Sequence, residues 1–530
     1  MPLLRTRRPR PDRNIREAGF EVTAIEHVPP GRFLAELRDV AAVRADCTAI
    51  SDEQASFTYA ELVTEIDRRA QRLVDAGVRP GDRIALVAEN SGYFLVSAFA
   101  VWRAGAVLVT IYPSAPVADL GFCLADADPV LALADTRTEA AVRAAVCDEL
   151  PVAVIDGAFE ATEVRSGRRP NPDGLREPLH LICYSSGTTS RPKAIMISES
   201  AVCNAAEVFG RTWRMTAEDR TIVALPMAWL FGLASTSMTT LLRGGTVITL
   251  RRSRPELIID AITRHRATML PGVTTMFTKL VAHLESLADK LDLSSLRFCV
   301  SGGEPRNEVA FGRWQALTGC PVYDNFCASE CFPFVTYDPV LDPQPVHGSA
   351  GKVVPGSSVR VVDADGNDVP PGEVGEAWTS GPGLMLGYWN DEEQTRKALT
   401  ADGWYRTKDL IRIDADGYVY VVGRVSDMII RGGSNVSPAE VERVLREHSS
   451  VHDVCVVGLP DEIYGQQVAA AVVPADTDID TDAVRAFAAE RLAAFKVPTV
   501  YRVIDALPLN PRTDKVDRRA VAELLQSQGA

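Results

Sequence analysis

Apolar and polar positions alternate in two different rhythms along most of this chain. Short apolar runs of strand length, such as residues 83–87 and 106–111, are separated by segments with the 3.6-residue spacing of an amphipathic helix. We expect helices over 60–76, 97–103 and 255–266, and a strand over 296–300 that ends in Ser-Gly-Gly. Strands that alternate with helices and glycine-rich turns predict an α/β protein, with parallel-rich sheets covered by helices.

The pattern changes after about residue 366, where shorter elements follow one another closely. They are predicted as a hairpin strand, a helix, two strands and a helix, at residues 417–424, 439–448, 453–458, 467–473 and 481–494. Together they form an α+β unit of about a hundred residues. We therefore predict a large N-terminal domain, residues 1–425, and a small, mobile α+β C-terminal domain, residues 426–530.

The composition is that of an ordinary globular protein, with 46% hydrophobic and 24% charged residues in a chain of 530. The net charge of −14 argues against a nucleic-acid-binding protein, because such proteins are usually basic. The basic N-terminus contains prolines and no apolar run, so we expect a solvated arm and no signal peptide. Arg103 and Gly105 interrupt the most apolar stretch, 93–112, which argues against a membrane span.

The ten cysteines are scattered along the chain without CxxC pairs. In an acidic chain without a secretion signal, we expect these cysteines to be reduced and the protein to be cytoplasmic. Cys327 and Cys331 are four residues apart, but no His or Cys partners stand at ligand spacing. A zinc site is therefore not expected.

Residues 184–193 read YSSGTTSRPK and follow an apolar strand at 179–183. Glycine and small hydroxylated residues allow backbone N–H groups to turn inward around an anion, and Lys193 adds a positive charge. The stretch is not a Walker A loop, because Pro192 stands where the second glycine of that motif belongs. Composition alone leaves a phosphate-binding loop and a Ser/Thr-rich surface turn equally open.

The same stretch closely resembles the phosphate-binding signature of the AMP-forming acyl-adenylate superfamily, which includes acyl-CoA synthetases, adenylation domains and luciferases. Further segments that resemble the motifs of this family follow in the family's order along almost the whole chain. They are FTYAEL (57–62), RAGAVLVTIYP (103–113), LPMAWLFGL (225–233), SGGEP (301–305), NFCASE (325–330), GWYRTKDL (403–410), GRVSDMIIRGGSNVSPAEVE (423–442), FKVP (495–498) and NPRTDK (510–515). One match would be weak evidence, but an ordered series is specific.

The resemblance implies a reaction in two halves. An acid attacks the α-phosphate of ATP to give an acyl-adenylate and pyrophosphate, and a thiol then displaces AMP. The implied cofactors are ATP, Mg²⁺ and CoA, or the phosphopantetheine arm of a carrier protein in place of CoA. The implied nucleotide-binding residues are Ser185, Ser186, Gly187, Thr188, Thr189, Lys193, Gly302, Gly303, Glu304, Asn325, Phe326, Asp409 and Arg424.

The resemblance also implies particular roles for single residues. Glu330, preceded by Ser329, resembles the catalytic carboxylate that contacts magnesium, a hard cation that prefers oxygen ligands. Phe326 offers a ring face to adenine, and Asp409 offers two oxygens to the ribose hydroxyls. Lys515 resembles the C-terminal catalytic lysine that bridges the acid's carboxylate and the α-phosphate.

Three glycine or acidic positions bear on movement of the smaller domain. Asp427 resembles the hinge residue, and Gly432 and Gly433 lie in the segment that swings toward the thiol in the second half-reaction. Two positions depart from the family pattern, because Lys408 and Asp514 stand where glycine is usual. Contact with phosphate and simple solvation both stay open for Lys408, and we favour solvation. We expect Asp514 to weaken the pull of the following lysine on phosphate without a change of reaction class.

The acid-binding segment, residues 223–233, contains no Asp. The resemblance implies an Asp there when an α-ammonium group is bound, so an α-amino acid is not expected. Cys327 stands where most of the family has glycine, and with Trp229 opposite and Ala328 beside it, its side chain removes room from the pocket. We predict a small or compact acid in place of a long fatty acid. A reactive thiol at Cys327 is the alternative, although the motif contains no His base.

Three enzymatic functions stay open at this point. They are an acyl-CoA synthetase, a stand-alone enzyme that loads a carrier protein, and a relative that activates another small acid, such as nitrite, for attack by an amine. A degenerate nucleotide sensor is a fourth hypothesis, and the retention of Glu330, Asp409, Arg424 and Lys515 argues against it. The expected partners are the acid, ATP and CoA, with a carrier protein as the alternative acceptor, and neither nucleic acid nor a membrane.

Overall fold

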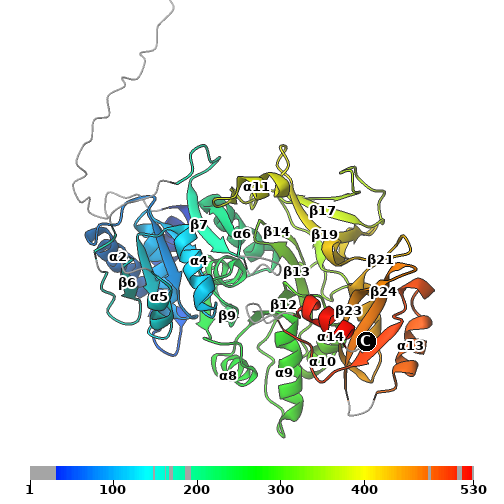
Figure 1. The fold of residues 1–530 in the computed structure, drawn as a ribbon. Helices are drawn as coiled ribbons and strands as arrows, with labels where there is room; N and C mark the ends of the chain where they lie inside the picture. The colour runs from blue at the N-terminus through cyan, green and yellow to red at the C-terminus, as the bar shows by residue number, and fades with distance from the viewer. Residues whose placement is uncertain are drawn as a thin grey trace, which may run out of the picture.

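A computed structural model describes residues 31–146, 150–161, 163–165, 171–185, 192–475, 479–509 and 516–527. Figure 1 shows a larger N-terminal domain at the left and centre and a smaller C-terminal domain at the right. The predicted fold class, a large sheet-rich α/β domain followed by a smaller α+β domain, is confirmed.

The first sheet of the larger domain has seven strands in the order β18-β8-β7-β4-β3-β5-β6. The five strands from β7 to β6 run parallel, whereas β8 and β18 are antiparallel to their neighbours. The strands are β3 (Arg83–Val87), β4 (Val107–Thr110), β5 (Leu131–Ala134), β6 (Val152–Val154), β7 (Leu179–Tyr184), β8 (Ala194–Ser198) and β18 (Gly387–Tyr388). Because helices cover both faces, the central strands are buried throughout and contain continuous apolar runs.

The second sheet has thirteen strands in the order β16-β17-β19-β20-β15-β14-β13-β12-β11-β9-β10-β1-β2. Its strands from β13 to β1 pair in parallel, and those from β14 to β16 pair antiparallel, so the expectation of parallel-rich sheets was too simple for this half. The strands are β1 (Thr48–Ser51), β2 (Phe57–Thr58), β9 (Arg220–Val223), β10 (Thr246–Thr249), β11 (Met269–Gly272), β12 (Phe298–Gly302), β13 (Val322–Ala328), β14 (Cys331–Thr336), β15 (Gly351–Val353), β16 (Ser358–Val362), β17 (Gly375–Ser380), β19 (Tyr405–Ile413) and β20 (Tyr418–Arg424).

The helices of the larger domain pack in three layers around these two sheets. Apolar side chains of α1, α2, α3 and α6 meet both sheets in one core, α4 and α5 cover the outer face of the first sheet, and α8, α9 and α10 cover the outer face of the second. The helices are α1 (Arg32–Val43), α2 (Tyr59–Asp75), α3 (Gly92–Arg103), α4 (Val117–Ala127), α5 (Glu139–Ala145), α6 (Glu199–Thr212), the π-helix η2 (Phe231–Met238), α7 (Thr239–Leu242), α8 (Pro255–His265), α9 (Thr274–Ser286), α10 (Glu308–Thr318) and α11 (Glu392–Ala398).

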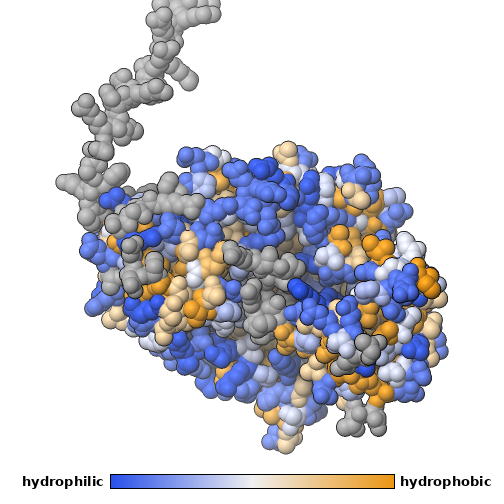
Figure 2. Space-filling model, in the orientation of Figure 1, coloured by the Kyte–Doolittle hydropathy of each residue, from blue (hydrophilic) through white to orange (hydrophobic). Residues whose placement is uncertain are grey.

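The smaller domain contains a five-stranded sheet with helices packed on both faces. Its elements are η3 (Val425–Asp427), β21 (Ile429–Arg431), β22 (Ser434–Val436), α12 (Pro438–Arg446), β23 (Val451–Asp461), β24 (Gly465–Pro474), α13 (Thr481–Ala489), η4 (Ala494–Lys496), β25 (Val500–Val503) and α14 (Arg518–Ser527). Figure 2 shows hydrophilic residues over much of the larger domain and more frequent hydrophobic ones over this domain at the right.

The elements expected from the sequence are present, with changed ends that have local causes. The helix expected at 97–103 begins earlier, at Gly92, because the Ser91 side chain caps it by accepting the N–H of Phe94. The helix expected at 481–494 was predicted too long, since it ends at Ala489 and the chain then turns so that Leu492 packs into the core. Within the described ranges, no helix combines the length and apolar character that a membrane span needs.

Candidate active site

The predicted phosphate loop connects two adjacent antiparallel strands, β7 and β8. A hydrogen bond joins its two described ends, because the Ser185 N–H donates to the Lys193 carbonyl at 2.8 Å. Tyr184 fixes the end of β7, since its hydroxyl donates to a carboxylate oxygen of Asp126 at 2.7 Å. Ser186, Gly187, Thr188 and Thr189 lie outside the described residues, so the structure places only the two ends of the loop.

Ser329 and Glu330 form the two-residue turn of the hairpin between β13 and β14, because Ala328 pairs with Cys331. The main-chain carbonyl of Glu330 accepts a hydrogen bond from the N–H of Met385 at 2.8 Å. The side-chain Oε1 of Glu330 accepts one from the Tyr388 hydroxyl, also at 2.8 Å. This turn therefore holds the predicted magnesium carboxylate at the tip of a rigid hairpin.

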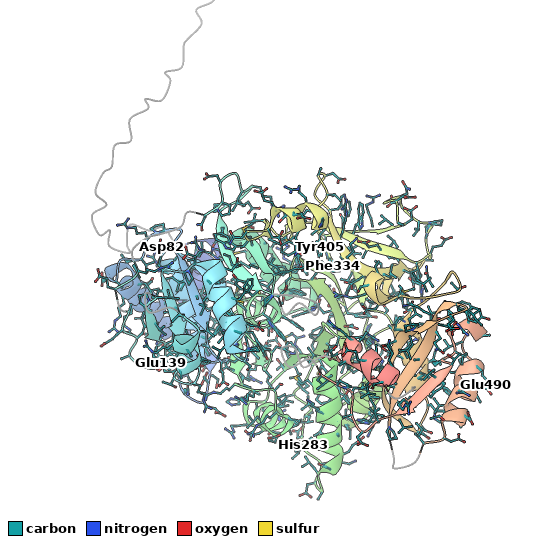
Figure 3. The ribbon with its side chains drawn as sticks, viewed as in Figure 1. Asp82, Glu139, His283, Phe334, Tyr405 and Glu490 are labelled. Carbon is teal, nitrogen blue, oxygen red and sulfur yellow. The ribbon has the colours of Figure 1, made fainter. Side chains whose placement is uncertain are left out.

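Tyr388 links Glu330 to the phosphate loop. The ammonium of Lys193 lies over the Tyr388 ring, 5.2 Å from its centroid. The neighbouring Tyr405 is labelled in Figure 3. Burial raises the pKa of Tyr405, and the charge of Glu330 adds to this rise. Sequence reasoning missed Tyr388, and its only local signal is an aromatic residue in the stretch Gly387-Tyr388-Trp389.

The geometry of Glu330 fits a magnesium ion that is also bound by phosphate. No described side chain bonds to its second carboxylate oxygen, Oε2, which leaves that oxygen for a hard cation. Within the described ranges, no group of three or more His, Cys, Asp or Glu side chains is arranged to hold a metal ion by itself. One carboxylate plus phosphate oxygens is the usual way in which Mg²⁺ is held when no all-protein cage exists.

Asp409 and Arg424 face each other across the paired strands β19 and β20. The Arg424 Nε donates to Asp409 Oδ1 at 2.8 Å, and no described residue bonds to Oδ2. Burial raises the pKa of Asp409, and the charge of Arg424 opposes this rise. The pair thus keeps one carboxylate oxygen available for a hydroxylated ligand.

Lys408 has a left-handed backbone with φ of 63°, which explains why glycine suits this position. Its ammonium donates to Glu376 Oε2 at 3.2 Å. The lysine is therefore exposed, as we favoured, and it is also paired with a carboxylate.

The predicted adenine segment lies at the ends of β12 and β13. Phe326 packs edge-to-face against Phe334, with ring centroids 4.9 Å apart, and both Gly302 and Asn325 are buried. Gly303 has a left-handed φ of 77°. The Glu304 carboxylate accepts the N–H of Thr275 at 2.8 Å and so caps α9, which leaves the main chain of Glu304 as its means of contact with a nucleotide.

The predicted acid wall is aromatic and tightly packed. Trp229 stacks on Tyr112, with ring centroids 5.3 Å apart and planes 16° from parallel. Phe231 begins the π-helix η2 and reaches Gly302, where an added Cβ would lie 3.2 Å from its ring. π-Helical turns are frequent at functional sites. Tyr112 and Phe231 were in recognised motifs, but their side chains were not predicted to line the pocket.

Cys327 and Ala328 are partly buried and pack against the same apolar core as Phe231. The Cys327 thiol donates to Asn325 Oδ1 at 3.1 Å. Burial raises the pKa of this thiol to about 12, so it stays protonated at neutral pH. A protonated thiol is a poor nucleophile, and the packing role therefore fits the structure better than covalent catalysis.

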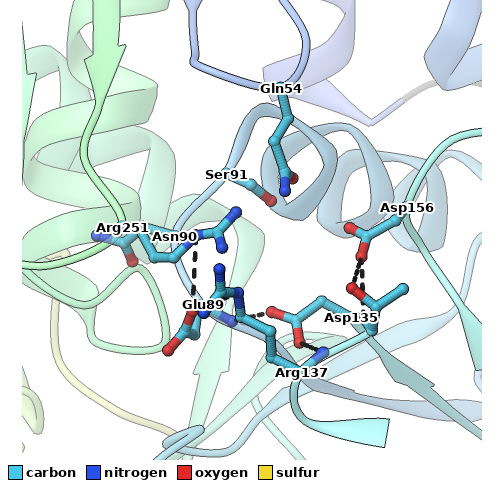
Figure 4. Close-up of a pocket in the computed structure, with 9 residues that line it drawn as sticks. Gln54, Glu89, Asn90, Ser91, Asp135, Arg137, Asp156 and Arg251 are labelled. Atoms are coloured by element: carbon cyan, nitrogen blue, oxygen red, sulfur yellow. Dashed lines mark hydrogen bonds and ion pairs between the residues drawn. The ribbon is translucent and has the colours of Figure 1, made fainter.

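A polar pocket lies outside the carboxyl ends of β3 and β5 (Figure 4). Its charged groups pair with one another, as shown by Arg251 Nε, which lies 3.6 Å from Glu89 Oε2. Asn90 in its floor donates to the Leu225 carbonyl and accepts the N–H of Met227, both at 2.8 Å. Asn90 thus fixes the chain just before Trp229 and supports the acid wall.

The predicted hinge and thiol-side residues lie at the start of the smaller domain. Asp427 accepts the hydroxyl of Ser426 at 2.8 Å, and Arg518 Nε lies 3.6 Å from Asp427 Oδ2. Gly432 and Gly433 form the turn between β21 and β22, with φ of 56° and 81°, a conformation that favours glycine at both positions. Lys515 and Asp514 lie outside the described residues.

Two family models match this chain. The model described as "AMP-binding enzyme" covers residues 37–389, and "AMP-binding enzyme C-terminal domain" covers residues 440–514. The chain is 36% identical over 470 residues to a feruloyl-CoA synthase of Amycolatopsis sp., and 34% identical over 474 residues to an indoleacetate–CoA ligase of Aromatoleum aromaticum. Each alignment covers 87% of this chain and 92% of the relative.

Solved structures of similar proteins agree with these matches. The ATP-bound crystal structure of MatB from Rhodopseudomonas palustris has a TM-score of 0.84 and 30% identity, and covers 95% of this chain and 100% of that one. The amide bond synthetase McbA from Marinactinospora thermotolerans has a TM-score of 0.82 and 28% identity, with 93% and 99% covered. The chain belongs to the AMP-binding enzyme family. The reaction class predicted from its motifs, an ATP-dependent, AMP-forming acid–thiol ligase of the acyl-CoA synthetase type, is confirmed.

Proposed function

We propose that this enzyme activates a compact, ring-containing carboxylic acid and transfers the acyl group to CoA. The observation that carries this proposal is the aromatic acid wall, in which Trp229 stacks on Tyr112 and Phe231 closes against Gly302. Cys327 adds volume on β13. Planar rings stack favourably on such walls, and the names of the two relatives describe acids that contain a ring.

We assign the first half-reaction to the groups around Lys193 and Glu330. An oxygen of the acid's carboxylate attacks the α-phosphorus of ATP, and the bond to pyrophosphate breaks. The loop from Ser185 to Lys193 neutralises the leaving phosphates, and Glu330 supplies an oxygen to magnesium, which offsets charge on the phosphates when it is bound. Asp409 and Arg424 hold the ribose, Phe326 packs on adenine, and Lys515 bridges the two reacting anions.

We assign the second half-reaction to a movement of the smaller domain, residues 426–530, relative to residues 1–425. The hinge is Asp427, which lies near Arg518 of α14. Gly432 and Gly433 then face the pantetheine arm, where the absence of side chains allows close approach. The thiolate attacks the acyl carbon, the thiol proton goes to solvent, and AMP leaves with the bonding electrons.

CoA is the acceptor that this proposal names, and a carrier protein or an amine are the alternatives. The likeness to an amide bond synthetase is the reason to retain an amine in the test. We place the reaction in the cytoplasm, where thiols stay reduced, since the cysteines in the described ranges are all free.

The test is a pyrophosphate-release screen over acids, each combined with CoA, a pantetheinylated carrier protein, an amine or no acceptor. The acids are a cinnamic-type acid, an indole acid, butyrate, palmitate, an α-amino acid and nitrite. We expect the ring-containing acids to exceed palmitate at least tenfold in kcat/KM and thioester to form with CoA. Preference for palmitate would contradict the proposal of a compact pocket. Turnover with a carrier protein or an amine, but not with CoA, would show that CoA is not the acceptor.

A further inference from the structure

Residues 385–389 connect the two parts of the site that handle phosphate and metal. The N–H of Met385 bonds to the Glu330 carbonyl, and the N–H groups of Leu386 and Trp389 bond to carbonyls of β8, Met196 and Ala194, all at 2.8 Å. The segment therefore runs from the hairpin that carries Glu330 to the strand that follows Lys193. We call residues 385–389 the bridging segment.

The side chain of Tyr388 contacts both Glu330 and Lys193. Its hydroxyl donates to Glu330 Oε1 at 2.8 Å, and its ring lies under the Lys193 ammonium. Its main chain is also fixed, because its N–H donates to Thr395 Oγ1 of α11 at 2.8 Å. Ring, hydroxyl and backbone are thus each held by a different element.

The chemistry of these contacts suits the orientation of a metal-binding carboxylate. A tyrosine phenol keeps its proton at neutral pH, so the Tyr388 hydroxyl stays a donor to Glu330 Oε1. A donor on Oε1 directs Oε2 outward to a cation. The ring attracts the Lys193 ammonium without neutralising it, which leaves the full positive charge for phosphate.

We propose that Tyr388 is a positioning residue that holds Glu330 and Lys193 in one arrangement for magnesium-bound ATP. The proposal rests on the proposed role of Glu330 as the magnesium ligand. It predicts that loss of the hydroxyl raises the Mg²⁺ concentration needed for ATP binding. Loss of the ring should additionally weaken the contact of Lys193 with the phosphates of ATP.

The experiment measures binding without turnover. Thermal unfolding of the full chain is followed at saturating ATP without the acid, and Mg²⁺ is titrated to give the concentration of half-maximal stabilisation. Tyr388→Phe should raise this concentration about tenfold, the usual effect of one hydrogen bond to a charged group. Tyr59→Phe is the matched control, because Tyr59 is a buried tyrosine whose hydroxyl donates at 2.7 Å to the Gly245 carbonyl. It should lower the melting temperature without a change in magnesium dependence.

Glu330→Ala separates the two hypotheses. If this variant binds magnesium-ATP as the wild type does, the proposed role of Glu330 fails. If Glu330→Ala is impaired and Tyr388→Phe stays within twofold of wild type, the role of Tyr388 fails alone. In the double variant, Tyr388→Phe should add less than twofold, because its partner is already gone.

Two further variants keep the proposal testable if Tyr388→Phe folds poorly. Thr395→Ala loosens the Tyr388 main chain without a change to its ring or hydroxyl, and should raise the half-maximal Mg²⁺ concentration about threefold. Tyr388→Leu removes the ring and should also raise the KM for ATP at saturating magnesium. Magnesium dependence and KM equal to wild type in both would overturn the proposal.

Discussion

The proposed phosphate side and the proposed acid side of this site are held together by different forces. On the phosphate side, Lys193, Tyr388 and Glu330 are joined by a hydrogen bond and a cation–π contact, and Asp409 pairs with Arg424. Each of these contacts requires a particular atom at a particular place. Replacement of one side chain there removes an interaction that no neighbour supplies.

The acid side depends on shape. Trp229 stacks on Tyr112, Phe231 meets Gly302, and the partly buried Cys327 thiol donates to Asn325 Oδ1. Van der Waals contacts are individually small and tolerate exchange at constant volume. Loss of a side chain on the phosphate side should therefore abolish a chemical step, whereas a substitution on the acid side should alter which acid the enzyme uses.

Lys515→Ala should have the largest effect, because it removes the charge that we propose to bridge the two reacting anions. We expect acid-dependent pyrophosphate release to fall about 10³-fold, in the upper range for one electrostatic group. Thioester formation from a supplied acyl-adenylate should fall much less. Lys397→Ala, which removes an exposed lysine paired with Glu393 on α11, is the control and should leave both steps unchanged. Equal pyrophosphate release by Lys515→Ala and wild type would contradict the assignment.

Asp324→Asn tests a buried charge on β13, the strand that also carries Cys327. Burial raises the pKa of Asp324 from 3.8 to about 7, although Arg306 opposes the rise. The unfolded chain releases this proton near pH 4 and the folded chain near pH 7, so wild type should lose stability relative to the Asn variant as pH rises between these values. The free energy of unfolding of wild type should fall by on the order of 4 kcal/mol relative to the Asn variant over this pH range, and the difference between the two proteins should stay constant above pH 7.

Denaturant unfolding of Asp324→Asn and wild type from pH 4 to pH 8 measures this difference. A constant difference in the free energy of unfolding over the whole range would show that Asp324 has an ordinary pKa. Glu308→Gln is a useful comparison, because burial tends to raise the Glu308 pKa but its pairing with Arg306 lowers it overall. That variant should lose stability relative to wild type above pH 5.

Cys327→Gly and Gly302→Ala change the acid side in opposite directions. Removal of the Cys327 side chain should enlarge the pocket and raise kcat/KM for longer or bulkier acids about tenfold. An added methyl at Gly302 would lie 2.9 Å from the Asn325 carbonyl and 3.2 Å from the Phe231 ring, so the backbone of β13 or the ring must shift. We expect kcat/KM to fall for every acid, and most for the largest. Kinetics over a series of acid sizes measure both. An unchanged profile in Cys327→Gly would remove this residue from the selectivity argument.

Lys408→Gly should have the smallest effect, because Lys408 lies at the edge of the phosphate side. Glycine relieves a left-handed backbone at a cost in unfolded-chain entropy. The lost pair with Glu376 is screened at its lysine end, since the Lys408 side chain is 59% exposed and that of Glu376 15%. We expect a change in unfolding free energy within about 1 kcal/mol and unaltered ATP binding. Glu376→Gln isolates the lost ion pair. A several-fold rise in the KM for ATP in Lys408→Gly would instead indicate that this lysine contacts phosphate.

Much of the fold followed from local patterns, and its errors have local causes. The strand at Arg83–Val87 was predicted with its observed ends, because a short apolar run between turns has few alternatives. The antiparallel half of the second sheet was not predicted, since strand direction depends on which strands meet. Glu304 stays a predicted nucleotide-binding residue, and its carboxylate also caps α9, a contact that no sequence pattern indicates.

The sequence by itself determined the reaction class and the segments that carry it, because charged and hydroxylated groups for phosphate chemistry must come from a few residue types in a fixed order. Only the tertiary structure decided which of them meet. Tyr388 stands 58 residues after Glu330 and bonds to it, and Tyr112 stacks on Trp229 from another sheet edge. Such contacts arise from the packing of distant segments, and the free energy that selects them is spread over the whole core. The contacts on which the proposed acid wall rests are therefore known only from the folded chain.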